Sequence, residues 1–210
     1  MTRWIVFDAM GVIFEEADDI EKELIPFLRR RNPGLNADLL LDTYHVASLG
    51  RMASSEFWRR IGFRREYPAI ENEYLDACLR LDPNFPRIAG ELSNRFSLAV
   101  FSNDIKEWSV YLRRKFGLDR LFQAAVISGE VGFRKPAPEI YPLLLTRLQA
   151  RGEDCIFIDD RIGNLIPAKE AGLIPVWLAK ENQPSPSEIP NRIGNLMELP
   201  ALVEKFFPIP

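Results

Sequence analysis

Histidine and cysteine are scarce in this sequence, and positive charge is not in excess. Its 210 residues include one histidine, His45, and two cysteines, Cys78 and Cys155, far apart in the chain. Two such cysteines form neither a disulfide framework nor a zinc site, so we expect two reduced thiols. The net charge of -3 gives the chain no general attraction for nucleic acid or for an anionic membrane surface.

Long apolar runs are missing as well. No stretch approaches the roughly 20 apolar residues of a membrane span, and the apolar run at residues 4–7 is too short for a signal peptide. We therefore expect a cytoplasmic protein that binds neither a membrane nor nucleic acid. Hydrophobic residues make up 47% of the chain, which is enough to bury a sizeable core.

Short apolar runs that end in polar or turn residues predict five β-strands. The first covers residues 4–7 and ends in the turn Asp8-Ala9-Met10-Gly11. The other four are expected at residues 98–101, 125–127, 156–158 and 174–178. Amphipathic segments predict helices at residues 82–95, 105–116, 138–152, 162–171 and 196–207. Alternating strands and helices predict an α/β fold, a parallel sheet with helices on both faces.

Residues 15–81 lack strand-like alternation and predict helices only. These helices are expected at residues 19–31, 36–49, 54–62 and 68–81, with Asn36 as the N-cap of the second. We interpret this segment as a small helical bundle inserted after the first strand. Near the other end of the chain, the proline- and serine-rich residues 183–190 are expected to form an ordered surface tail.

Polar side chains follow four of the predicted strands. Ligands of an open parallel sheet bind beyond the carboxyl ends of its strands, so these side chains are expected to converge. The side chains are those of Asp8 after the first strand, Ser102, Asn103 and Asp104 after the second, Ser128 and Lys135 after the third, and Asp159, Asp160 and Asn164 after the fourth. Gly11 and Gly129 also follow the first and third strands.

This set is chemically coherent. A carboxylate such as Asp8 can attack phosphorus or an activated carbon and form a covalent intermediate. If the target is a phosphate, a divalent cation is needed to remove the repulsion between two anions. Mg²⁺ prefers oxygen ligands, which Asp8 and Asp160 can supply, with Asp159 in support. Lys135 can neutralise charge in the transition state, and Ser102 can hydrogen-bond the transferred group.

Four segments resemble the motifs of the haloacid dehalogenase-like superfamily, in the family's order. They are Asp8-Ala9-Met10-Gly11-Val12, Ser102-Asn103, Lys135-Pro136 and Asp159-Asp160. The resemblance to the third motif extends over residues 132–141, and Asn164 belongs to the resemblance to the fourth. The resemblance implies a Rossmann-like core at residues 1–14 and 82–210, and a small helical cap of the C1 type at residues 15–81.

The resemblance also implies a mechanism and a ligand. Asp8 would be the nucleophile, and Mg²⁺ would be bound by Asp8, the Met10 carbonyl and Asp160, with Asp159 completing the site. Ser102 and Lys135 would complete the catalytic set. The substrate would be a small phosphorylated molecule contacted by Met10, Gly11, Asn103 and Asn164, and the protein would be a monomer or a homodimer.

Met10 departs from the family pattern. Phosphatases that the sequence resembles carry a second aspartate two residues after the nucleophile, which protonates the leaving group and later activates water. Methionine transfers no proton, and general acid–base catalysis typically contributes 10²–10⁴-fold. The only histidine, His45, could replace this acid if it faces the core, although we favour a structural or solvent-exposed role for it.

Four functions remain open, and a hydrolase of the phosphatase type is favoured. The protein could be a slow or specialised phosphatase, with an acid from the cap or a leaving group that needs no proton. It could be a 2-haloacid dehalogenase, although such enzymes of the family lack the carboxylates at Asp159 and Asp160. Cleavage of a C–P bond ranks last. The family's enzymes for this reaction use a lysine of the cap as a Schiff base, and Lys22 is the only lysine before Lys106. Finally, it could be a catalytically weak phosphate- or metal-binding regulatory protein.

Overall fold

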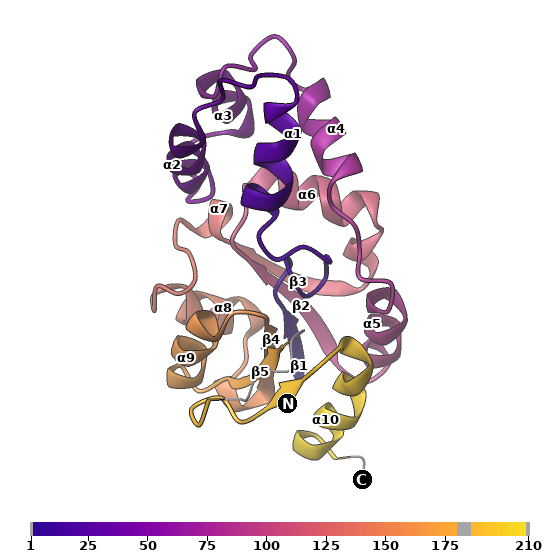
Figure 1. Cartoon of the computed structure of the whole chain (residues 1–210). Coiled ribbons are helices and arrows are strands. Elements are labelled where there is room, and N and C mark those ends of the chain that lie inside the picture. The colour runs from indigo at the N-terminus through magenta and orange to yellow at the C-terminus, as the bar shows by residue number, and fades with distance from the viewer. Residues whose placement is uncertain (1, 180–185, 209–210) are drawn as a thin grey trace.

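Six parallel strands form a single sheet in the computed structural model, which describes residues 2–179 and 186–208. The strand order is β3-β2-β1-β4-β5-β6 (Figure 1). The strands are β1 (Trp4–Phe7), β2 (Ser97–Ser102), β3 (Phe122–Ile127), β4 (Cys155–Asp159), β5 (Ile174–Leu178) and β6 (Arg192–Ile193). The order reverses direction at β1, so the carboxyl ends of β1 and β4 form the switch point where such sheets bind ligands.

Helices cover both faces of the sheet, as the sequence predicts. They are α5 (Phe85–Ser93), α6 (Lys106–Lys115), α7 (Ser128–Val131), α8 (Ile140–Leu148), α9 (Ile162–Glu170) and α10 (Leu199–Phe206). On one face, α5, α6 and α10 pack against inward-pointing residues such as Ile5 and Phe7. On the other face, α8 and α9 pack against Trp4 and Val6. All four residues of β1 are buried, because helices cover both faces of this strand. Such a strand is apolar throughout.

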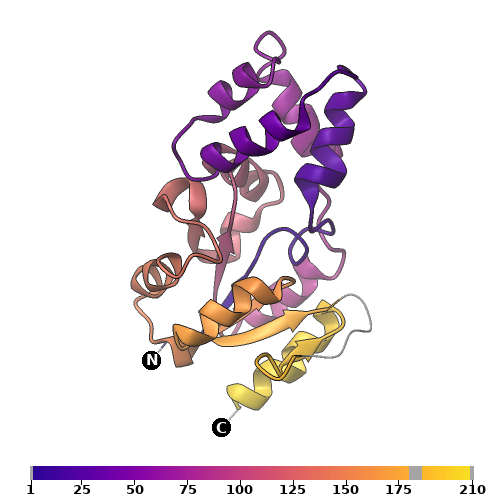
Figure 2. The ribbon, with the colours of Figure 1, turned by 60° about the vertical axis from the view of Figure 1, so that its left-hand side comes forward.

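The chain after the first strand forms a block of helices at the carboxyl end of the sheet (Figures 1 and 2). We call η1 to α4 the helical block. Its elements are η1 (Ile20–Leu24), α1 (Ile25–Arg29), α2 (Ala37–Ala47), α3 (Ser54–Arg60) and α4 (Ala69–Ala77). Asn36 is the N-cap of α2, as predicted, and its side chain accepts a hydrogen bond from the N–H of Leu39 at 3.0 Å.

Several expected boundaries are wrong. The helix expected from Asp82 begins at Phe85, because the Asp82 carboxylate accepts from the N–H of Asn84 (2.8 Å) and closes a turn instead. The helix expected to end near Gly152 ends at Leu148. Helix α7 and strand β6 are not predicted at all, being only four and two residues long.

Two further expectations from the sequence concern the tail at residues 183–190 and a membrane span. The first three residues of the expected surface tail at 183–190 lie outside the described residues, whereas Ile189 is fully buried in the core. Across residues 2–179 and 186–208, no helix is long and apolar enough to cross a membrane.

Trp108 of α6 joins the helical block to the sheet. Its ring lies among those of Tyr44, Phe57, Trp58 and Tyr74, with centroid distances of 5.9, 5.4, 6.2 and 5.4 Å. Its indole N–H and that of Trp58 each donate to Glu71 Oε2 at 2.7 Å. Because Trp58, Trp108 and Glu71 are buried, the Glu71 carboxylate satisfies two donors that have no access to water.

We expect Glu71→Ala to lower the free energy of unfolding by about 3 kcal/mol, because it leaves a cavity and two unsatisfied indole donors. Glu71→Gln is the matched control, since its amide oxygen can accept from both indoles. Urea unfolding measures both variants. Equal stability of the alanine variant and the wild type would show that the two indoles do not depend on Glu71.

The stability that Glu71 contributes is also expected to depend on pH. Burial raises the pKa of Glu71, against the lowering effect of its hydrogen bonds from Trp108 and Trp58. The folded protein thus holds this proton more tightly than the unfolded chain, so the stability from Glu71 is greatest at low pH. It decreases as pH rises through the raised pKa. Urea unfolding at acidic and alkaline pH is expected to show this decrease relative to Glu71→Gln, and parallel curves would contradict it.

Candidate active site

Three carboxylates meet at the switch point of the sheet. Asp8 follows β1 directly and Asp159 ends β4, and these strands pair in a register that sets Phe7 opposite Ile158. The N–H of Asp8 continues this pairing by donating to the carbonyl of Ile158 at 2.9 Å. Oxygens of Asp8, Asp159 and Asp160 all lie within 4.8 Å of one another. Strand register therefore brings together carboxylates that lie about 150 positions apart in the sequence.

The Lys135 ammonium lies between two of these carboxylates. Its Nζ donates to Asp8 Oδ1 at 2.6 Å, to Asp159 Oδ2 at 2.8 Å and to the carbonyl of Phe101 at 2.8 Å. These three bonds use all the donors of an ammonium group. Burial alone lowers the pKa of Lys135, but Asp159 and Asp8 outweigh burial and raise it above its ordinary value. Lys135 is therefore a fixed positive charge beside the nucleophile candidate.

Two asparagines position these charged groups. Asn103 pairs with the backbone of Lys135 in both directions, donating to its carbonyl (2.8 Å) and accepting from its N–H (2.9 Å). Asn164 donates to both oxygens of Asp159, at 3.1 and 3.0 Å, and its own carbonyl accepts from Tyr141. The sequence suggests both asparagines as substrate contacts, and the structure shows that both also hold the charged residues in place.

The surroundings of Asp160 suit a cation. Its Oδ1 is buried and has no hydrogen-bond partner among the residues that the structure describes. Burial raises the pKa of Asp160 to about 6, and the charge of Asp159 also raises it. Burial raises the pKa of Asp8 to about 7, and the lowering effect of Lys135 does not cancel this. Three carboxylates against one ammonium leave surplus negative charge, which a divalent cation would compensate.

The absence of a side chain at Gly11 makes room for the Asp160 carboxylate. A Cβ at this position would lie 2.7 Å from both Cγ and Oδ2 of Asp160, and the backbone has a φ of +84°. Only glycine adopts this conformation without strain and also avoids the clash. Gly11 thus acts on the carboxylate cluster rather than lining the cavity.

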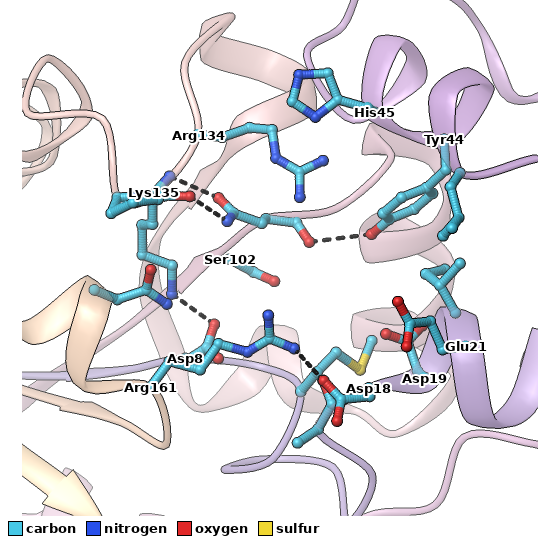
Figure 3. Close-up of a pocket in the computed structure, with 17 residues that line it drawn as sticks. Asp8, Asp18, Asp19, Glu21, Tyr44, His45, Ser102, Arg134, Lys135 and Arg161 are labelled. Carbon is cyan, nitrogen blue, oxygen red and sulfur yellow. Dashed lines mark hydrogen bonds and ion pairs between the residues drawn. The ribbon is translucent and has the colours of Figure 1, made fainter. Parts of the chain in front are cut away.

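A cavity of about 480 Å³ opens above these residues, a size suited to a small molecule. Six of the nine predicted site residues line it: Asp8, Met10, Ser102, Asn103, Lys135 and Asn164. Figure 3 shows Ser102 near the centre, with Asp8 and Lys135 on one side. Gly11, Asp159 and Asp160 are not among the residues that line it.

The helical block supplies the opposite side of the cavity. Tyr44 and His45 of α2 line it, so His45 has the position that would let it act on a ligand. From the sequence, a structural or solvent-exposed role is favoured for His45, and no role is expected for Tyr44. Nor are Arg134 and Arg161 expected at the site, although they line the cavity beside Lys135 and Asp160. Adjacency to the motif residues is the one signal that could have identified these two arginines.

Comparisons with known proteins place the chain in a family. Residues 2–172 match a family model described as haloacid dehalogenase-like hydrolase. A glyceraldehyde 3-phosphate phosphatase from Pyrococcus furiosus is 34% identical over 185 residues, covering 67% of this chain and 76% of that protein. A protein of the same name from Pyrococcus abyssi is 28% identical over 88 residues, and there the match spans only 36% of the relative.

Solved structures share the fold at lower identity. A 2-haloacid dehalogenase from Pseudomonas syringae superposes with a TM-score of 0.72 at 20% identity, covering 98% of this chain and all of that one. A family enzyme from Bacteroides thetaiotaomicron, solved with magnesium and inorganic phosphate, has a TM-score of 0.71 at 17% identity. It covers 88% of this chain and 98% of its own. At such identities these two structures support the fold alone.

Replacing Gly11 tests how the carboxylate cluster is built. We expect Gly11→Ala to displace the Asp160 carboxylate and to weaken Mg²⁺ binding at least roughly tenfold, as measured by calorimetry. Gly62→Ala is the matched control, because Gly62 also has a positive φ (+95°) but no atom within 4 Å of the added Cβ. Both variants are expected to lose about 1–2 kcal/mol of stability through backbone strain. Unchanged Mg²⁺ affinity in Gly11→Ala would contradict the role of this glycine.

Proposed function

Because the chain belongs to the haloacid dehalogenase-like hydrolases, we propose that it is a Mg²⁺-dependent phosphatase of small phosphorylated molecules. The observation that carries this proposal is the buried ion cluster, in which Lys135 bonds to both Asp8 and Asp159. The Pyrococcus furiosus relative, named for a phosphatase activity, supports the phosphate as the reacting group. The cavity supports a small substrate.

In this proposal Asp8 is the nucleophile. Lys135 holds one oxygen of Asp8 and leaves the other to attack phosphorus, which forms an acyl phosphate on Asp8. The ester P–O bond breaks, and the leaving alkoxide takes its proton from water, because Met10 cannot supply one. Ser102 can hydrogen-bond an oxygen of the transferred group, and the positive charge of Lys135 stabilises the negative charge of the transition state. Water then hydrolyses the acyl phosphate, which releases inorganic phosphate and restores the Asp8 carboxylate.

Asp8, Asp160 and the Met10 carbonyl are the proposed ligands of Mg²⁺, with Asp159 beside them. When bound there, Mg²⁺ would remove the repulsion between the Asp8 carboxylate and the phosphate dianion. The buried oxygen of Asp160 without a protein partner supports this assignment.

We propose that residues 15–81 act as a cap on a core made of residues 1–14 and 82–210. Two chain segments cross at this boundary and pair with each other: the N–H of Glu15 donates to the carbonyl of Arg80, and that of Asp82 to the carbonyl of Ile13. The position of Tyr44 and His45 on the cavity supports a role for this segment in substrate choice. Cap residues would also exclude bulk water from the site.

Met10 favours a second candidate. A halide leaves without a proton, so a 2-haloacid dehalogenase has no need of the missing aspartate. The retained carboxylates of Asp159 and Asp160 favour the phosphatase, since a dehalogenase has no use for a metal. Release of halide from 2-haloacids without any divalent cation, and no release of phosphate, would establish this alternative.

Replacing the nucleophile tests the proposal directly. We expect Asp8→Asn to lower phosphate release from 4-nitrophenyl phosphate by roughly 10³-fold or more, because the amide cannot attack phosphorus. Asp38→Asn, an exposed change on α2, is the matched control and should retain activity. A chelator should abolish the wild-type rate. Turnover that survives in Asp8→Asn would exclude Asp8 as the nucleophile.

Restoring the acid tests the role of Met10. We expect Met10→Asp to raise turnover of a sugar phosphate by about 10²-fold, because its carboxyl can protonate the leaving oxygen. Met10→Asn, a polar change that supplies no proton at neutral pH, is the control and should show no such gain. An aspartate variant that folds normally and gains nothing would mean that the acid comes from another residue.

A further inference from the structure

Arg134 brings into the cavity a positive charge that has no ion-pair partner in the part of the chain that the structure describes. The other two strong cations of the cavity are neutralised: Lys135 by Asp8 and Asp159, and Arg161 by Asp18 at 2.7 Å. No carboxylate of residues 2–179 or 186–208 lies within ion-pair distance of the Arg134 guanidinium. Arg134 is also half-buried, which makes an unmatched charge costly.

The groups that hold Arg134 fix its position without neutralising it. Its guanidinium donates to the hydroxyl of Ser48, which is the C-cap of α2, and lies 5.6 Å from the ring centroid of Tyr44. The hydroxyl is uncharged, and the dipole at the C-terminus of α2 and the π face of Tyr44 attract the cation without supplying a full negative charge. A full positive charge is therefore held in one orientation and remains available to a ligand.

The guanidinium points into the cavity between His45 and Ser102 (Figure 3). Acidic side chains line the other wall, where Asp18 is bound to Arg161 and Asp19 accepts from the hydroxyl of Tyr74 at 2.9 Å. The reacting end of the cavity is marked by Asp8 and Lys135. The Arg134 guanidinium thus lies beside the space above Ser102.

We propose that Arg134 determines specificity by binding a second anionic group, a carboxylate or a second phosphate, on a substrate whose first phosphate lies at Asp8. The proposal rests on the phosphatase function proposed above and narrows its substrates to doubly anionic phosphate esters. The planar fork of a guanidinium matches a carboxylate or a phosphate through two parallel hydrogen bonds. Two anionic groups of one small molecule would then lie in one cavity of about 480 Å³, the first at Asp8 and the second at Arg134.

Three small phosphate esters test this proposal through kcat/KM. Glycerol 3-phosphate has no second anion, 3-phosphoglycerate adds a carboxylate, and propane-1,3-diol bisphosphate adds a phosphate. A charge-assisted hydrogen bond contributes about 1.5–3 kcal/mol, so we expect a preference of roughly 10–100-fold for at least one of the two doubly anionic esters. Arg134→Gln should remove this preference, and Arg134→Lys should retain part of it.

Two controls separate recognition from a purely structural contact. Arg120→Gln removes an exposed arginine away from the cavity and should leave the preference unchanged. Ser48→Ala removes the partner of Arg134 in the helical block. If Arg134 only fastened this block, Arg134→Gln and Ser48→Ala would lower kcat/KM for all three esters by the same factor. That result, or a wild type without preference, would overturn the proposal.

Binding to the Asp8→Asn variant distinguishes failure of this inference from failure of the phosphatase function. Calorimetry with Mg²⁺ gives the affinity for glycerol 3-phosphate and for 3-phosphoglycerate. Hydrolysis without an Arg134-dependent preference would refute the role of Arg134 and leave the phosphatase intact. Tighter binding of a doubly anionic ester that requires Arg134, with no hydrolysis by the wild type, would refute the phosphatase and retain the anion site. Equal binding without hydrolysis would refute both.

Discussion

The bonds of one buried ammonium to two carboxylates are the interaction on which the site depends. Lys135 contributes all three of its donors to Asp8, Asp159 and the carbonyl of Phe101, which lie at the carboxyl ends of three adjacent strands. Removing one partner of such a buried pair typically costs about 3–5 kcal/mol, because an uncompensated charge remains. The carboxyl ends of β1, β2 and β4 therefore have to stay in register, and the bonds made by Asn103 and Asn164 hold the charged groups in that arrangement.

The negative charge of the three carboxylates that Lys135 does not compensate connects the fold to the chemistry. One ammonium cannot neutralise the three carboxylates, and Asp160 has a buried oxygen with no partner among the described residues. The glycine at position 11 allows Asp160 to approach Asp8 so closely. Met10 stands where the family's phosphatases carry their second aspartate, and its side chain cannot transfer a proton. The molecule thus has what the proposed phosphorylation of Asp8 requires, and it lacks the family's usual acid for the leaving group.

Sequence patterns predict the elements that depend on local structure. The bounds of β1 are predicted correctly, and the rule that ligands bind beyond the carboxyl ends of parallel strands places Asp8, Lys135 and Asp159 together before any coordinates are known. Such rules do not predict which side chains of distant segments come into contact. Trp108 bonds to Glu71 from 37 positions away, and Arg134 lies against Tyr44 and Ser48 only because α2 folds back over the sheet.

The acyl phosphate on Asp8 is the central claim, and detecting it tests that claim most directly. The protein would be mixed with Mg²⁺ and acetyl phosphate, quenched in acid after a short interval, digested and examined by mass spectrometry. The account predicts that the peptide containing Asp8 gains the mass of one phosphoryl group, and that it does so only when Mg²⁺ is present. An unmodified Asp8 peptide during steady phosphate release, or a phosphoryl group on another residue, would contradict it.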